Sequence, residues 1–444
     1  MYRLLIYDAY VTMLRTIKAI FMKYELHTLK NGLRVVLVPI KDTQTATVVI
    51  MVGTGSRYES KKENGLAHFL EHMFFKGTKK RPSAKAIAEE LDAMGARNNA
   101  FTAKNRTAYY AKADFAHVDN ILDVISDMFL NSTLPQKEIN KERGTIVQEI
   151  NMYEDMPMRT IYEVFDALLF GDNHPLGRDI LGPKKNILSF TRKNFKDYLN
   201  RAYVAENSVV CVAGKFSKQK VLSKIREDFS HMPTGKIPNF ETKMITQMRQ
   251  QVAIKHKKTD QTHIILGVPS YELGHKDEFA LVVLAAILGQ GMSSRLFTEV
   301  REKRGLAYSV RSFVESYVDI GYFATYAGVE HKNLESAVRT ILTELQKIKN
   351  KLISAKELKK AKEFTKGQMA LSLDTTDALA FAVAESLILR DKVYTPDKTR
   401  MKIDAVKASD IKRVAKDIFK TSKLNLAIIG PHTKKARFEK ILTL

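Results

Sequence analysis

Residues 187–214 read ILSFTRKNFKDYLNRAYVAENSVVCVAG, and residues 403–430 read IDAVKASDIKRVAKDIFKTSKLNLAIIG. In each stretch the closing glycine stands 27 positions after the first isoleucine, and Phe195 aligns with Ile411. Each predicts a helix with 3.6-residue apolar spacing, a polar turn, and a strand that ends at glycine. The openings of the two halves, TATVVIMVGTGSRYE and THIILGVPSYE, also correspond. A match of this length indicates that the chain contains an internal duplication.

The repeat predicts a chain of two similar domains. Strands cluster at the start and end of each half, with helices between and after them, which is typical of an α+β fold. We therefore expect a mainly antiparallel β-sheet in each domain, with helices packed on one face. Proline and glycine in MPTGKIPNFETKM break any regular element between the halves. The predicted units are an extension over 1–22, a domain over 23–235, a linker over 236–249 and a domain over 250–444.

The composition restricts the classes of partner. The 444 residues carry a formal net charge of +23, which could suit nucleic acid, an anionic membrane or acidic substrates. The lysines are spread along the chain, however, and we find neither an arginine-rich run nor a groove-reading motif. We expect a basic, solvated surface and no nucleic-acid partner. The single cysteine, Cys211, excludes an intramolecular disulfide and fits a reducing compartment such as the cytoplasm.

The first 22 residues are mostly apolar, but charges such as Arg15 and Lys18 interrupt them. No window of about 20 apolar residues could therefore span a bilayer. Two interpretations remain. The segment is an upstream extension, with the folded protein beginning near Met22, which we favour; or it is an amphipathic targeting peptide, which would place the protein in the mitochondrial matrix.

The segment GLAHFLEHMFF carries the most informative chemistry. Its apolar residues follow i, i+3, i+4, i+7 and i+8, as expected for the buried stripe of a helix. His68 and His72 are four apart and share a second face, and Glu71 lies beside them. Two imidazoles next to a carboxylate suit a zinc ion and a base for its water. The alternative is that these are ordinary polar neighbours on a helix.

A catalytic zinc site needs a third protein ligand. The helical segment LPQKEINKERGTIVQEINMYEDMP offers Glu142 and Glu149. These glutamates lie two turns apart, which is about 10 Å along the axis, so only one can bind the same ion. The residues alone leave this choice open, and both could be solvated helix charges.

Several motifs together resemble one family. HFLEH is followed by ERGTIVQEI, with 76 residues between His72 and Glu149, and NGLRVVLVP, GSRYE, FGDNHPLGRDILG and SSRLFTEVREKRGLAYSV accompany them. The combination resembles the inverted-motif zinc peptidases of the pitrilysin and insulinase type, in the processing-peptidase-like subgroup, over 23–444. The resemblance implies that His68, His72 and Glu149 bind zinc and that Glu71 is the general base. It gives Glu142 a supporting role without contact to the metal.

The resemblance also implies an arginine–tyrosine pair from the second half. Tyr308 is expected to donate to the oxyanion that develops on the scissile carbonyl, and Arg301 to hold a substrate carbonyl. Arg304 is a nearby alternative, but the spacing to Tyr308 favours Arg301. Without the family resemblance, the alternative is that Tyr308 is an ordinary packed tyrosine and Arg301 an ordinary surface arginine.

The stretch GARNNAFTAKNRTAYYAK predicts an exposed strand that an extended peptide could join by backbone hydrogen bonds. By the resemblance, Asn99, Ala100 and Phe101 contact the substrate backbone. A plain hairpin is the alternative.

The resulting prediction is a zinc-dependent metalloendopeptidase that cleaves extended or unfolded peptides between two similar halves. We expect a homodimer, or a heterodimer with a related inactive subunit. Two other functions remain as alternatives: a non-catalytic structural subunit of the same family, and a basic nucleic-acid or membrane binder that carries zinc.

Overall fold

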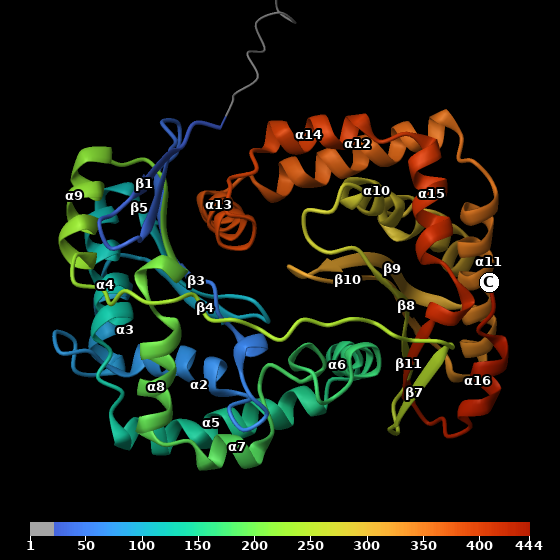
Figure 1. Ribbon diagram of the computed structural model, residues 1–444, viewed down its shortest axis with the longest axis horizontal. Helices are drawn as coiled ribbons and strands as arrows, with labels where there is room; N and C mark the ends of the chain where they lie inside the picture. The colour runs from blue at the N-terminus through green and yellow to red at the C-terminus, as the bar shows by residue number, and fades with distance from the viewer. Residues whose placement is uncertain (1–21) are drawn as a thin grey trace, which may run out of the picture.

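The computed structural model describes residues 22–444, which form two halves that each contain a β-sheet (Figure 1). The first sheet has six strands in the order β1-β2-β6-β3-β5-β4, and only β2 and β6 run parallel. Its strands are β1 (Glu25–Thr28), β2 (Arg34–Pro39), β3 (Thr45–Val52), β4 (Arg97–Thr102), β5 (Thr107–Asp114) and β6 (Ser208–Gly214).

The second sheet has five strands in the order β7-β11-β8-β10-β9, and only β7 and β11 run parallel. The strands are β7 (Gln251–His256), β8 (Thr262–Ser270), β9 (Ala307–Ser316), β10 (Gly321–Val329) and β11 (Asn425–Gly430). Apart from β1, this is the arrangement of the first sheet, so the prediction of two α+β domains with mainly antiparallel sheets is confirmed.

The repeated segments occupy equivalent places. In the first half α8 (Arg192–Ala202) leads through the turn η5 (Ala205–Asn207) into β6. In the second half α15 (Ala408–Ile418) leads through η8 (Thr421–Lys423) into β11. The aligned Phe195 and Ile411 are both fully buried, because each lies on the apolar stripe that packs its helix against its own sheet.

Each half places its own helices on one face of its sheet. In the first half these are α2 (Leu66–Met73), α3 (Ala84–Ala93), α4 (Val118–Asn131), α5 (Gln136–Glu154), α7 (Lys184–Ser189), α8 and α9 (Lys218–Phe229). In the second half they are α10 (Glu278–Gly289), α11 (Leu334–Asn350), α12 (Ala355–Ser372), α14 (Pro396–Ala405), α15 and α16 (Lys435–Ile441).

One helix from each half packs on the sheet of the other half. It covers the face that the helices of that other half leave open. The helix α13 (Thr376–Arg390) packs against β3 and β6, where Val49 and Cys211 belong to the same buried cluster. The helix α6 (Pro157–Phe170) packs against β8 and β11, with Phe165 in the shared core. Figure 1 shows α13 beside the first sheet and α6 beside the second. Strand alternation supplies apolar side chains to both faces, so each central sheet is buried on both sides.

The segment between α9 and β7 forms no helix or strand among the described residues. The predicted linker over 236–249 lies within it, and the exact domain limits remain a prediction. The predicted extension lies, apart from Met22, outside the described residues. Within 22–444, no helix combines the length and apolar character needed to cross a bilayer.

Candidate metal centre

The helix α2 presents two different faces. Its apolar stripe, which includes Phe69 and Met73, is fully buried in the first core. The helix begins after Gly65, whose φ of 100° favours glycine. A Cβ at this position would also lie 2.5 Å from the carbonyl oxygen of Leu181. The close approach fixes the start of α2, and the face opposite the core carries His68 and His72.

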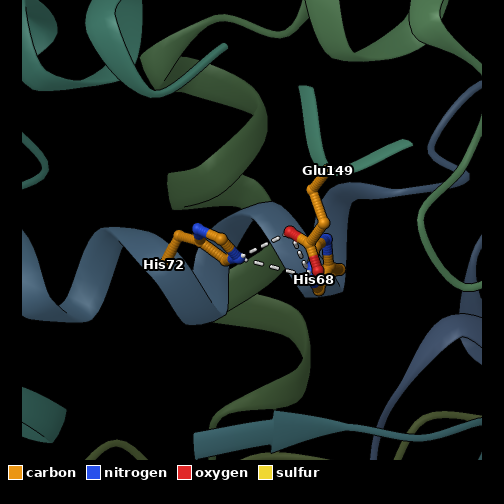
Figure 2. Close-up of side chains that lie close together, drawn as sticks. All are labelled: His68, His72 and Glu149. Carbon is orange, nitrogen blue, oxygen red and sulfur yellow. Dashed lines mark hydrogen bonds and ion pairs between the residues drawn. The ribbon is translucent and has the colours of Figure 1, made fainter. Parts of the chain in front are cut away.

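The helix α5 supplies the third side chain. Ile146 and Ile150 bury one face of α5 in the core, and Glu149 reaches His68 and His72 from an adjoining face. Glu149 Oε2 lies 3.6 Å from His68 Nε2 and 3.5 Å from His72 Nε2. The two Nε2 atoms are 3.3 Å apart. Figure 2 shows the three side chains converging.

These separations fit a tetrahedral zinc site. With zinc–ligand bonds of about 2.0–2.1 Å, two ligands at a tetrahedral angle lie roughly 3.3–3.4 Å apart. The three observed separations of 3.3 to 3.6 Å match that edge length. Two imidazole nitrogens and a carboxylate oxygen are also the donors that zinc prefers. No second group of three such donors comes together within residues 22–444.

Glu142 orients one of the histidines. Its Oε1 lies 2.9 Å from His72 Nδ1, and its Oε2 lies 2.7 Å from Lys76 Nζ. Burial opposes ionisation of Glu142, but hydrogen bonds from His72 and Lys76 lower its pKa. A proton on His72 Nδ1 donates to this carboxylate and leaves Nε2 free to bind a metal. His68 Nδ1, in contrast, is buried without a partner in the described part of the chain, so packing holds that ring.

The side chains of the site are partly shielded from water, and this burial shifts the pKa values of His68, Glu149 and Glu71. Burial, and next the nearby His72, lower the pKa of His68 to about 3, so its ring is neutral and keeps a lone pair at neutral pH. Burial raises the pKa of Glu149. Burial also raises the pKa of Glu71, although a hydrogen bond from Thr102 opposes that change.

The strand β4 borders the site. Thr102 Oγ1 donates to Glu71 Oε2 at 2.6 Å, and strand alternation places Ala100 on the same face as Thr102. Within the described chain β4 is an edge strand that pairs only with β5. Because Ala103 N–H donates to the Arg106 carbonyl, the alternating ladder turns the backbone groups of Ala100 away from β5. The Asn99 side chain accepts from Ala100 N–H at 2.9 Å, and Phe101 faces α13 on the other side.

The structure places Arg301 and Tyr308 in contact with each other. Arg301 Nη1 donates to the Tyr308 carbonyl oxygen at 2.9 Å, and its guanidinium lies 4.8 Å from the Tyr308 ring centre. Tyr308 is the second residue of the edge strand β9, and its residue surface is 76% exposed. Arg304 instead donates to the carbonyl oxygen of Glu299 and pairs with its carboxylate. Within residues 22–444, no hydrogen bond joins either member of the pair to His68, His72 or Glu149.

Two residues of the site were missed from the sequence. Thr102 was part of the predicted strand, and its alternation with Ala100 could have indicated that it faces α2. Glu59, in the GSRYE motif, is buried and accepts from Ala67 N–H at 2.6 Å and from Gly65 N–H at 3.0 Å. The Glu59 carboxyl group thereby accepts from amides that the first turn of α2 leaves without helical partners, but no local pattern in the sequence indicated this long-range cap.

Comparisons with known proteins identify the family. The family model described as "Insulinase (Peptidase family M16)" matches residues 34–184, and the model described as "Peptidase M16 inactive domain" matches residues 189–364. A Bacillus subtilis protein named "uncharacterized zinc protease YmxG" is 37% identical over 410 residues, covering 91% of this chain and 98% of that relative. The chain belongs to the insulinase family of peptidases. The candidate metal donors all lie in the part that matches the insulinase model.

Other similar proteins agree with this assignment. A Streptomyces coelicolor protein named "uncharacterized zinc protease SCO5738" is 34% identical, and the match covers 91% of this chain and 89% of that relative. A solved structure titled as a protease from Helicobacter pylori superposes with a TM-score of 0.85 at 27% identity, covering 93% of this chain and 100% of that one. The structure titled "peptidase M16 inactive domain" from Pseudomonas fluorescens has the same TM-score at 18% identity, which supports the fold alone.

Proposed function

We propose that this chain is a zinc-dependent metalloendopeptidase that hydrolyses extended or unfolded peptides. The observation that carries the proposal is the convergence of His68, His72 and Glu149 at tetrahedral edge lengths, with Glu71 next to them in α2. Relatives covering nine-tenths of the chain are named zinc proteases, which supports the same activity.

His68, His72 and Glu149 would hold the metal, and Glu142 would keep His72 in the binding tautomer. A bound zinc ion supplies a more acidic water and polarises the scissile carbonyl. Glu71, held by Thr102, takes the proton from the attacking water and returns it to the leaving amine. Its raised pKa makes Glu71 a stronger proton acceptor than an exposed glutamate.

The free edge of β4 would bind the peptide as an added strand. Peptide addition would replace the contact between Asn99 and Ala100 N–H with a hydrogen bond to the substrate backbone. Such binding recognises an extended main chain more than a particular sequence. Tyr308, supported by Arg301, would donate to the developing oxyanion when the halves bring β9 toward the bound peptide.

Incubating the metal-loaded protein with a mixed peptide library, with and without a chelator, tests the proposal. We expect internal cleavages that the chelator abolishes and added zinc restores. The matched variant His72→Ala should lose both zinc and cleavage, and Glu154→Gln, on an exposed part of α5, should retain both. Zinc binding without any cleavage would instead favour the structural-subunit alternative. Sedimentation of the same sample would distinguish a homodimer from a chain that needs a related partner.

A further inference from the structure

A buried ion pair joins the two halves close to the metal helix. Arg57 lies in the turn η1 (Ser56–Tyr58) of the first half, and its side chain has no exposed surface. Asp319 lies in the turn between β9 and β10 of the second half. Arg57 Nη2 donates to Asp319 Oδ2 at 2.5 Å and to the Glu241 carbonyl at 3.2 Å. The Arg57 guanidinium also stacks 4.1 Å from the ring centre of Phe240.

Stability alone does not account for this pair. Arg57 Nε and Nη1 and Asp319 Oδ1 are buried without hydrogen-bond partners in the described chain. Burying charges with unmet hydrogen bonds is costly, and apolar replacements of such pairs are often equally stable. A directional contact between one arginine and one aspartate does, however, set the position of the backbone that carries it. The contact therefore points to a positioning role.

The turn that carries Arg57 continues directly into the cap of α2. Glu59, two residues later, accepts hydrogen bonds from the Gly65 and Ala67 amides and from Asn64 Nδ2 at 3.3 Å. Ala67 directly precedes His68. A displacement of the turn would therefore move the N-terminus of α2 and the histidine next to it.

The same turn is also hydrogen-bonded to the loop that directly follows β4, the strand that borders the site. Ser56 N–H donates to the Ala103 carbonyl at 3.2 Å, and Arg57 N–H donates to the Lys104 carbonyl at 2.9 Å. Thr102, which donates to Glu71, directly precedes Ala103. One short turn thus contacts the second half, the start of the metal helix, and the loop after the strand that orients Glu71.

We propose that the Arg57–Asp319 pair is a positioning contact through which docking of the second half fixes α2. When the pair forms, the turn holds Glu59 against the first amides of α2. It also holds the Ala103 carbonyl, and with it the neighbouring Thr102, in position. His68 and Glu71 then keep their places relative to Glu149. The inference rests on the proposed function only for its catalytic consequence; the mechanical coupling is a property of the fold.

Hydrogen exchange of the Gly65 and Ala67 amides measures the coupling without requiring any cleavage. We expect Asp319→Asn to accelerate exchange at both amides by about tenfold, which corresponds to about 1.4 kcal/mol. Arg57→Lys keeps the positive charge but loses the planar guanidinium group, so it should give an exchange rate between those of the wild type and Asp319→Asn. The matched control is Asp377→Asn, because Asp377 pairs with Lys112 across the halves at 2.6 Å without contacting this turn. Equal exchange rates in Asp319→Asn and Asp377→Asn would overturn the proposal.

A second readout separates positioning from general weakening. In the metal-loaded protein, Asp319→Asn should lower kcat about tenfold, with KM within about twofold of the wild-type value. The double variant Arg57→Gln with Asp319→Asn should lose no more kcat than the more impaired of the two single variants. Additive losses would contradict a shared pathway through the pair. If the wild type cleaves no peptide, the proposed function fails, but the exchange measurement still decides whether the second half controls α2.

Discussion

Glu142 Oε1 lies 2.9 Å from His72 Nδ1, while His72 Nε2 lies 3.3 Å from His68 Nε2. One carboxylate therefore fixes which nitrogen of His72 faces the other donors. Supporting carboxylates of this kind set both the tautomer and the ring direction of a histidine ligand.

Replacing Glu142 by glutamine should weaken zinc binding without removing it. The amide oxygen can still accept from His72 Nδ1, but the negative charge is lost, and we expect affinity to fall about 10- to 100-fold. Competition with a chromophoric chelator measures the change. Glu154→Gln, on the exposed end of the same helix, is the control and should bind zinc as the wild type does. Unchanged affinity in Glu142→Gln would show that His72 needs no orienting carboxylate.

Replacing Glu71 by glutamine should separate metal binding from catalysis. Because Glu71 is the proposed base and not a ligand, we expect zinc content to stay near one per chain while peptide cleavage falls about 10²- to 10⁴-fold. Thr102→Val removes the hydrogen bond that holds Glu71 and should cause a smaller loss. Full cleavage by a zinc-loaded Glu71→Gln protein would exclude Glu71 as the base.

Replacing Tyr308 by phenylalanine should remove one donor to the oxyanion. We expect kcat to fall about 10²-fold while KM changes little, because the hydrogen bond is made mainly in the transition state. Arg304→Ala is the matched control, since Arg304 is engaged with Glu299 and not with Tyr308. An equal effect of both variants would indicate a general disturbance of the turn before β9.

Replacing Asp166 by asparagine should change how stability depends on pH. Burial raises the pKa of Asp166 to about 6, although Lys104, Tyr322 and Arg159 lower it and Asp179 raises it further. A carboxyl whose folded pKa exceeds its unfolded value contributes stability that is full below the unfolded pKa and is lost as pH rises through about 6.

The measurement is urea unfolding of both proteins between pH 5 and pH 7.5. The free energy of unfolding of the wild type, relative to Asp166→Asn, should fall by about 1 kcal/mol over this range. A difference that stays constant with pH would mean that Asp166 is already ionised at pH 5.

Short-range patterns predicted most of the side chains that converge at this site. The 3.6-residue spacing of GLAHFLEHMFF placed His68, Glu71 and His72 on one helical face, and the structure shows that face beside Glu149. The choice between Glu142 and Glu149 could not be made from spacing, because both lie on the side of α5 that faces His72. The family resemblance favoured Glu149, and the structure brings it to both Nε2 atoms.

The sequence by itself determined the repeated α+β halves and the helix that carries the two histidines, because both depend on periodicities within about thirty residues. Only the tertiary structure decided that α6 and α13 cross to the opposite sheets, and that Arg57 meets Asp319 beside the start of α2. Contacts between residues hundreds of positions apart depend on how two finished domains pack, and no local pattern in either partner encodes that packing.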